Sequence, residues 1–265
     1  MPLTNISIKH LRCFNDIEIT LSPGINFFYG ANGSGKTSML EAVFIFSSGK
    51  SFKSSNLQSL IQYEKEGFYL KGFDKNSGHI VEVEKRKNKS VSLKLNNTKI
   101  VTSKLIKKFP CTPIHNNTFS FASASPDFRR KLLDRSIFIA EDKFSSTWFS
   151  YYRTLKHRNA LLKDNRISDI YAWNQKLALE GELLTKYRKN FFDKTLVEFK
   201  NLLNILEPKN VFDFLNLISI NFSYGWKSEN KLLDSLEENH NKDLNRKTTT
   251  HGPHKSDITF LINDI

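Results

Sequence analysis

The stretch GANGSGKTSMLEAVFIFSSG, from Gly30 to Gly49, decides how this chain folds. Its first eight residues match G-x-x-x-x-G-K-[ST], a pattern that forms a phosphate-binding loop when a strand precedes it and a helix follows. INFFY (25–29) is a short apolar run typical of a strand buried on both faces, and residues 39–46 carry a broad helical apolar face. The sequence therefore predicts an α/β protein with a nucleotide-binding loop.

Each residue type in the pattern has a chemical task. Gly30, Gly33 and Gly35 let the backbone turn tightly with its N–H groups inward, and the next helix offers its positive N-terminal end to phosphates. Lys36 reaches the β and γ phosphates, and Thr37 supplies a hydroxyl for Mg²⁺. The motif predicts binding of a nucleoside triphosphate with magnesium.

Composition limits the remaining classes. The 265 residues allow one large or two smaller domains, and the net charge of +13 favours nucleic acid as partner, with an acidic membrane surface second. A Lys-rich composition of the kind an AT-rich genome produces would weaken that inference. Neither a membrane span nor a signal peptide is evident, which predicts a cytoplasmic protein. Cys13 and Cys111 are predicted to be free thiols, without zinc.

The hydrophobic pattern outlines the rest of the chain. Alternation over residues 6–21 predicts two edge-type strands, and residues 68–101 predict an antiparallel meander with polar turns. A short helix (103–109), a strand (110–115) and a polar loop (116–124) follow. Ser125-Pro126 begins a run of helices that includes a helical hairpin with KDNRIS as its turn. Strands are predicted at 212–224 and 257–262, with an exposed helix at 228–240 between them.

Five further blocks accompany the loop, and together they resemble one family. They are HLRCF (10–14), SPDFRRKLLD (125–134), LKHRNALLKD (155–164), AWNQKLALEGELL (172–184) and TTTHGPHKSDITF (248–260). In this order they resemble RecF, a family of bacterial recombination mediators related to the heads of SMC and Rad50 proteins. The resemblance implies an ABC-type P-loop ATPase head with an antiparallel β meander and an inserted helical hairpin arm. Its expected parts are an ATPase lobe (1–124), the arm (125–208) and a return to the head (209–265).

The resemblance also implies a function. It implies binding of ATP and Mg²⁺, ATP-dependent homodimerisation, binding of DNA at single-strand gaps and duplex junctions, and loading of RecA with RecO and RecR. DNA repair, replication restart and the SOS response follow as processes. The residues expected to hold ATP are Gly30, Ala31, Asn32, Gly33, Ser34, Gly35, Lys36, Thr37 and Ser38, with Thr37 also on Mg²⁺. Arg12 resembles the family's phosphate-side arginine; the alternative is a solvated arginine at a strand end.

Two departures from the family pattern change what is expected. Asn116-Asn117 stands where relatives usually have Pro-Glu, and the sequence stops at Asn263-Asp264-Ile265, before the ABC signature and the Walker B strand. The head is therefore expected to be incomplete at the C-terminus, with an unpaired sheet edge and marginal stability. It is expected to bind nucleotide better than it hydrolyses it, and no catalytic residue is predicted. The alternatives are an inactive or DNA-binding-only remnant without ATP-driven dimerisation, and a small-molecule kinase, which the meander and arm disfavour.

The remaining candidate sites have competing interpretations. Lys85, Arg86 and Lys87, with Lys89, form a basic turn that either contacts DNA phosphates or is a solvated hairpin tip. Arg129 and Arg130 are candidates for DNA binding or an inter-subunit role. His251, His254 and Asp257 imitate metal-ligand spacing, but the Gly252-Pro253-His254 turn is interpreted as structural or close to the nucleotide. Aromatic residues of the arm follow helical spacing and are predicted to be core.

Overall fold

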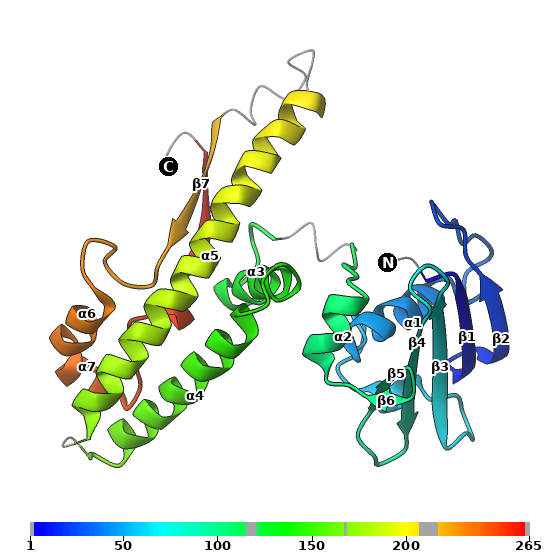
Figure 1. Cartoon of the computed structure of the whole chain (residues 1–265), viewed down its shortest axis with the longest axis horizontal. Helices are drawn as coiled ribbons and strands as arrows, with labels where there is room; N and C mark the ends of the chain where they lie inside the picture. The colour runs from blue at the N-terminus through cyan, green and yellow to red at the C-terminus, as the bar shows by residue number, and fades with distance from the viewer. Residues whose placement is uncertain (1–2, 115–120, 167–168, 207–216, 263–265) are drawn as a thin grey trace. The chain divides into compact units, whose positions relative to one another are not determined.

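The computed structural model describes residues 3–114, 121–166, 169–206 and 217–262. The chain divides into two compact units, unit 1 (residues 1–115) and unit 2 (residues 116–265), each described here by itself (Figure 1). The predicted further boundaries at residues 124 and 208 stay a prediction. Unit 1 contains β1 (Asn5–Leu11), β2 (Phe14–Thr20), α1 (Lys36–Ser48), η1 (Leu57–Leu60), β3 (Gly67–Asp74), β4 (His79–Arg86), β5 (Ser92–Leu95), β6 (Thr98–Lys99) and α2 (Thr102–Lys108).

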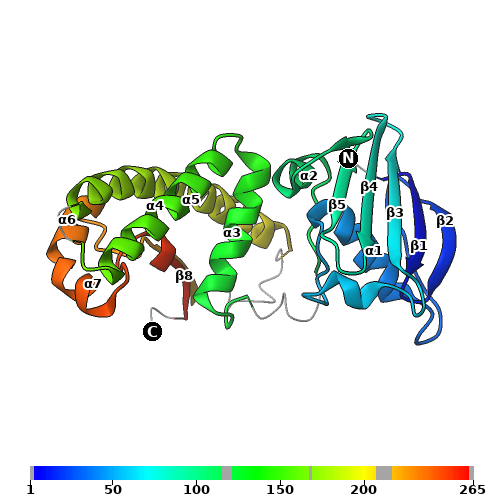
Figure 2. The same ribbon diagram turned by 90° about the horizontal axis from the view of Figure 1, so that it is seen from below.

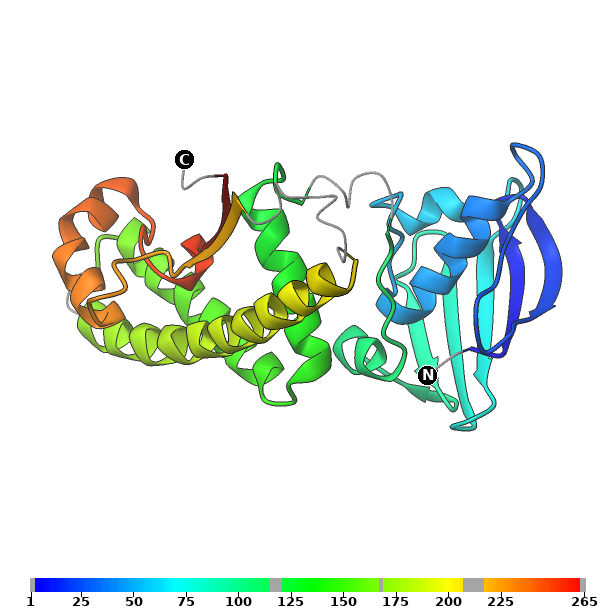
Figure 3. The ribbon, with the colours of Figure 1, turned by 90° about the horizontal axis from the view of Figure 1, so that it is seen from above.

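Unit 1 is one antiparallel sheet with two helices on the same face. The strand order is β2-β1-β3-β4-β5-β6, so the predicted meander is confirmed (Figures 1 and 3). Alternate residues such as Ile6, Leu70 and Val83 are fully buried and pack with Phe46 of α1 and Leu105 of α2. The prediction that both first strands are edges is wrong for β1, which pairs with β2 on one side and β3 on the other.

Residues 25–29 do not form the predicted buried strand. Ile25, Phe27 and Tyr29 are 78%, 82% and 93% exposed, and none of the described strands pairs with them. A strand needs a ladder partner for its backbone N–H and C=O groups. The amide of Asn26 instead exchanges hydrogen bonds with the backbone of Ser22, accepting from its N–H at 2.8 Å and donating to its carbonyl at 2.9 Å. The predicted strand at 110–115 is also absent over 110–114, while His115 lies outside the described residues.

Unit 2 is mainly helical. It contains α3 (Pro126–Ala140), α4 (Phe144–Lys163), α5 (Ile170–Leu206), β7 (Ile218–Ser223), α6 (Leu232–Glu238), α7 (His240–Arg246), η4 (Pro253–Lys255) and β8 (Asp257–Ile262). As predicted, Ser125 caps α3 by accepting from the Phe128 N–H at 3.3 Å, with Pro126 in the first turn. The predicted hairpin is α4 and α5, with α6 and α7 beside the end where these two helices meet (Figures 1 and 2).

The core of unit 2 joins segments that are distant in sequence. Tyr151 of α4 and Leu184 of α5 are fully buried with Ile137 of α3. Leu232 and Leu236 are also fully buried in this core, so the helix predicted as exposed at 228–240 is wrong in that respect. β7 and β8 pair antiparallel, and the first part of the predicted strand 212–224 lies outside the described residues. No helix in the described ranges is long and apolar enough to cross a membrane.

Candidate functional site

The glycine loop before α1 has the backbone geometry of an anion site. Gly30, Gly33 and Gly35 have φ of 146°, 84° and 96°, values that residues with a Cβ rarely adopt. No side chain caps the N-terminus of α1, which begins at Lys36. The first N–H groups of the helix have no intrahelical acceptor and carry the positive end of its dipole. An anion bound in front of the loop would accept hydrogen bonds from these N–H groups and would be attracted by the positive end of the helix dipole.

Residues at the turn between β1 and β2 pack closely against Gly35 of this loop. A Cβ added to Gly35 would lie 2.6 Å from the ring of Phe14 and 2.9 Å from Sγ of Cys13. Gly35 is therefore required both by its φ angle and by this close approach. At Gly30 a Cβ would meet Ser34 Oγ at 3.1 Å, so the loop is tight at its other end as well.

The side chains of the loop complete a donor set that fits a magnesium-bound polyphosphate. Lys36 Nζ donates to the carbonyls of Gly30 and Ala31, both at 2.8 Å, which holds the ammonium across the loop. Thr37 is exposed, while Ser38 is only 8% exposed. A mobile cation, an exposed hydroxyl and uncapped N–H groups are the groups that such a ligand needs.

Arg12 is partly exposed, and its guanidinium is paired with a buried carboxylate. Its Nε and Nη2 donate to Glu41 of α1 at 2.8 and 3.2 Å, and Glu41 is fully buried. Ser51 Oγ donates to the same carboxylate. Nη1 is the guanidinium nitrogen that Glu41 does not engage. Sequence reasoning missed Glu41, although it lies one turn after Thr37 and so on the same face of α1.

The basic turn between β4 and β5 is exposed and partly neutralised. Arg86 donates to Glu84 at 2.5 Å, Lys87 to Glu66 at 3.1 Å, and Lys85 to the backbone carbonyl of Lys89. Such exposed pairs contribute little to stability. They also reduce the local positive charge, as expected of a solvated hairpin tip. Contact with DNA at this turn stays a prediction.

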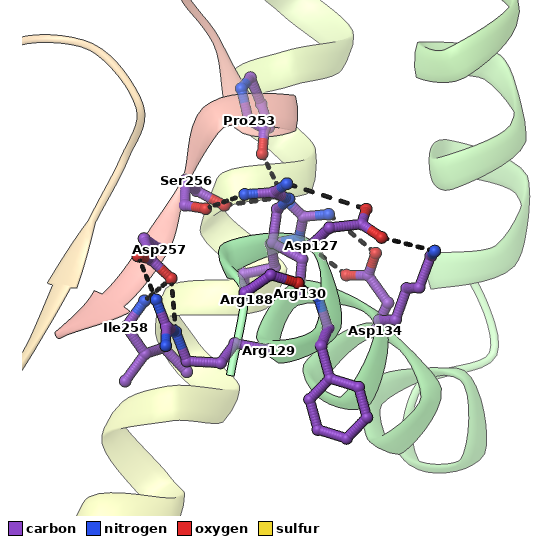
Figure 4. A network of polar contacts seen from close by, with 12 residues as sticks. Asp127, Arg129, Arg130, Asp134, Arg188, Pro253, Ser256, Asp257 and Ile258 are labelled. Atoms are coloured by element: carbon purple, nitrogen blue, oxygen red, sulfur yellow. Dashed lines mark hydrogen bonds and ion pairs between the residues drawn. The ribbon is translucent and has the colours of Figure 1, made fainter. Parts of the chain in front are cut away.

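Arg129 and Arg130 hold β8 against α3 (Figure 4). Arg129 donates to both oxygens of Asp257 at 2.8 and 2.7 Å, and Arg130 donates to the Ser256 carbonyl at 2.8 Å. Burial opposes ionisation of Asp257, but the hydrogen bonds from Arg129 and the Ile258 N–H, together with the positive charges of Arg129 and Arg130, outweigh it and lower the pKa of this carboxyl. The DNA contacts of both arginines stay a prediction, and for Arg129 they would require this buried pair to break.

Two fully buried arginines tie the sequence blocks of unit 2 together. Arg188 of α5 donates to both oxygens of Asp134 at 2.7 and 2.8 Å and to the Pro253 carbonyl at 2.6 Å (Figure 4). Arg158 of α4 donates at 2.7 Å to each of three partners, Asn174, Asp243 and Thr249. The blocks at 125–134, 155–164, 172–184 and 248–260 therefore meet in one polar network. Sequence reasoning did not single out either arginine.

The Gly252-Pro253-His254 turn belongs to this network. His254 Nε2 donates to the Thr249 carbonyl at 2.9 Å, which leaves Nδ1 to accept from the Tyr151 hydroxyl at 2.8 Å. Burial lowers the pKa of His254 to about 4, so the ring is neutral at pH 7. Within the described ranges no cluster of three or more His, Cys, Asp or Glu side chains is placed to hold a metal ion.

Comparison with known proteins agrees with this geometry. A family model described as an AAA domain matches residues 5–250. The DNA replication and repair protein RecF of Pseudoalteromonas translucida is 34% identical over 282 residues, covering 99% of this chain and 72% of that protein. RecF of Acinetobacter baumannii strain SDF is 32% identical over 262 residues, and the alignment covers 97% of this chain and 71% of that protein.

Solved structures show the same fold. A structure of the recombination mediator protein RecF with ATPrS, in the RecFOR pathway, aligns with all of this chain and 74% of its own, at a TM-score of 0.83 and 25% identity. A second RecF structure, with ATP, aligns at a TM-score of 0.83 and 24% identity. The predicted P-loop ATPase head with an antiparallel sheet and inserted helices is therefore confirmed. The chain belongs to the RecF family of DNA replication and repair proteins.

Proposed function

We propose that this chain binds ATP with Mg²⁺ at the glycine loop and binds DNA as a recombination mediator of the RecF type. The observation that carries the nucleotide proposal is the loop itself, where positive-φ glycines, the uncapped α1 N-terminus and Lys36 converge. The names of the relatives support DNA repair and replication as the process, and the net charge of +13 supports an anionic partner.

Each loop residue has a defined part in the proposed binding. The N–H groups of residues 33–38 would surround the phosphates, and Lys36 would exchange the carbonyls of Gly30 and Ala31 for phosphate oxygens. Magnesium, when bound, neutralises part of the triphosphate charge, and Thr37 would supply its protein ligand. Asn32, Ser34 and Ser38 would line the loop. Arg12, fixed by Glu41, would direct Nη1 towards the phosphates.

The wider role follows from the family. We propose action at single-strand gaps and duplex junctions in the cytoplasm, with RecO and RecR as partners in loading RecA. Replication restart and the SOS response would be the processes served. ATP-driven homodimerisation would couple nucleotide to DNA. Solved RecF structures described as carrying ATP or ATPrS and as belonging to the RecFOR pathway support this assignment.

The nucleotide proposal is tested by thermal unfolding of the whole chain with Mg-ATP, with Mg-AMP and with neither. A ligand that binds only the folded state stabilises it by about 2.7 kcal/mol at a concentration a hundred times its Kd. Mg-ATP is expected to raise the Tm of unit 1 and Mg-AMP to raise it less. An unchanged Tm with both nucleotides would refute the proposed ATP site.

The DNA proposal is tested by anisotropy of a labelled gapped duplex, with and without Mg-ATP, over a series of salt concentrations. Binding through phosphates is expected to weaken steeply with salt, and ATP is expected to strengthen it. Tight binding that ignores ATP would instead identify a DNA-binding-only protein without ATP-driven dimerisation. Binding that is weak and insensitive to salt would refute the phosphate contacts.

A further inference from the structure

Unit 2 carries a basic hollow along one face of α4. The hollow has a volume of about 410 Å³ and is lined by Tyr152, Leu155, Lys156, Asn159, Ala160 and Lys163. These residues recur at intervals of three and four, so they lie on one face of the helix. Two lysines and one amide face the hollow, and no carboxylate lines it. We call it the α4 hollow.

A second basic segment docks beside the α4 hollow. Asn159 Oδ1 accepts from the Thr249 N–H at 2.8 Å and from the Thr249 hydroxyl at 2.7 Å. Thr249 ends the stretch that leaves α7, and this stretch begins with the exposed cations Arg246 and Lys247. Lys156, Lys163, Arg246 and Lys247 form no ion pair within the described residues. Cations without ion-pair partners therefore come from two elements that the Asn159–Thr249 contact joins.

The two elements are held together rigidly. Arg158, two residues after Lys156, is fully buried and donates to Asp243 of α7 and to Thr249. Thr250 also binds Asp243, through its N–H at 2.9 Å. Because this scaffold is already ordered, only the lysine and arginine side chains would lose freedom when a ligand binds.

The surroundings favour phosphate groups over bases. His157 stacks on Trp173 with ring centroids 5.0 Å apart, and the Lys176 ammonium lies 5.7 Å from the centre of the same indole. Trp173 is thus already engaged, and Tyr152 of the hollow packs against Trp148 with ring centroids 4.4 Å apart, so neither ring is a free platform for an unpaired base. Of the two acids beyond the end of α4, Asp169 is ion-paired with Arg166 at 3.0 Å, and Asp164 directly follows Lys163 in the sequence.

A hollow of unit 1 offers a contrast. It lies on the open face of the sheet and is lined by Lys9, Glu18, Tyr69 and Lys71, among others. There Lys9 pairs with Asp16 at 2.9 Å, and Tyr69 donates to Glu82. Cations on that face alternate with acids, so a polyanion would meet repulsion as well as attraction. The α4 hollow has no such alternation.

We propose that the α4 hollow and the adjoining Arg246-Lys247 segment bind the phosphate backbone of duplex DNA, independently of sequence. The proposal rests on the DNA-binding function proposed above and places a phosphate contact on α4 and the end of α7, at residues other than the candidate arginines of α3. Backbone contacts of this kind position a duplex without reading its bases.

The test uses the full chain carrying Lys156→Gln, Lys163→Gln and Lys247→Gln. A matched control removes three exposed lysines of α5 in the same unit, by Lys186→Gln, Lys194→Gln and Lys200→Gln. Both triple variants lower the net charge equally, and circular dichroism checks that both fold. Anisotropy of a labelled blunt duplex is measured across a salt series, and poly-glutamate at matched charge serves as a competing polyanion.

The hollow variant is expected to lose roughly tenfold or more in affinity, and its salt slope is expected to fall by about 2 to 3, since each lost phosphate contact removes about 0.9. The control is expected to stay close to the unaltered chain. Equal losses in both variants, or an equal loss of poly-glutamate binding, would overturn the duplex assignment. If the unaltered chain binds DNA and the hollow variant matches it, this inference fails while the proposed function stands. No DNA binding by the unaltered chain would refute both.

Discussion

The glycine loop of unit 1 and the polar network of unit 2 are built in opposite ways. The loop is largely exposed and made of backbone, and the charge of Lys36 is held there by the Gly30 and Ala31 carbonyls. The network is buried and made of side chains, with Arg158 and Arg188 fully enclosed. Buried pairs make breaking one partner costly, whereas an exposed loop is free to exchange its contacts for a ligand. Changes in the network should therefore affect stability, and changes in the loop should affect binding.

The largest expected effect is on stability, from Arg188→Ala. This change leaves Asp134 buried without its partner and should cost about 3 to 5 kcal/mol of unfolding free energy. Trp148, Trp173 and Trp226 all lie in unit 2, so tryptophan fluorescence in urea reports the unfolding of this unit. Lys189→Ala, which removes an exposed pair with Asp193, is the control and should cost less than about 1 kcal/mol. Equal costs would show that the Arg188 network does not stabilise unit 2.

The next effect is a pH dependence at His254. Its folded pKa of about 4 lies below the unfolded value of about 6.5, so the folded state favours the neutral ring. This contribution is complete above pH 6.5 and is lost as the pH falls towards 4. Between pH 7.5 and 4.5 the unaltered chain should lose about 2 to 3 kcal/mol more than His254→Asn.

The same urea unfolding, monitored by tryptophan fluorescence, measures this difference. His240→Gln on α7 is the control, because His240 is only half-buried. The expected pH dependence should survive in this variant. Parallel pH profiles for the unaltered chain and His254→Asn would contradict a buried neutral imidazole.

The smallest of these stability effects concerns the support beneath the loop. Gly35→Ala combines a φ of 96° with a Cβ 2.6 Å from the Phe14 ring, so strain and crowding together should cost about 2 kcal/mol. Gly33 has a φ of 84° but open space around a Cβ, and Gly33→Ala should cost less. Hydrogen exchange of the α1 amides measures both, with Gly24→Ala as the control. A loss at Gly35 no greater than at Gly33 would show that Phe14 simply moves aside.

How far sequence alone reached differs between the two regions. The loop was predictable because only glycine adopts its φ angles, which leaves a local pattern in the sequence. The N-terminus of α3 was predictable for the same reason, since Ser125 and Pro126 act within one turn. The conformation of residues 25–29 was not predictable, because a buried strand depends on a partner strand. The hydrogen bonds between Ser22 and Asn26 compete locally with strand formation.

The network left no local pattern in the sequence. Arg188 and Asp134 are 54 residues apart, and Arg158 and Asp243 are 85 apart. Each charge looks like a solvated surface residue until the chain has folded. Resemblance located the block containing Arg129, but its pairing with Asp257 required the three-dimensional arrangement. Long-range pairs of this kind are set by packing, which helical or strand periodicity does not encode.

The most direct test is a fluorescence titration of the chain with a labelled ATP analogue in the presence of Mg²⁺, compared with Lys36→Ala and Lys50→Ala. Lys50 is an exposed lysine just after α1 and serves as the control. Losing a charge-assisted hydrogen bond to phosphate should weaken binding of Lys36→Ala about ten- to a hundredfold, with Lys50→Ala unchanged. Equal affinity in all three proteins, or no saturable binding by the unaltered chain, would contradict an ATP site at the glycine loop.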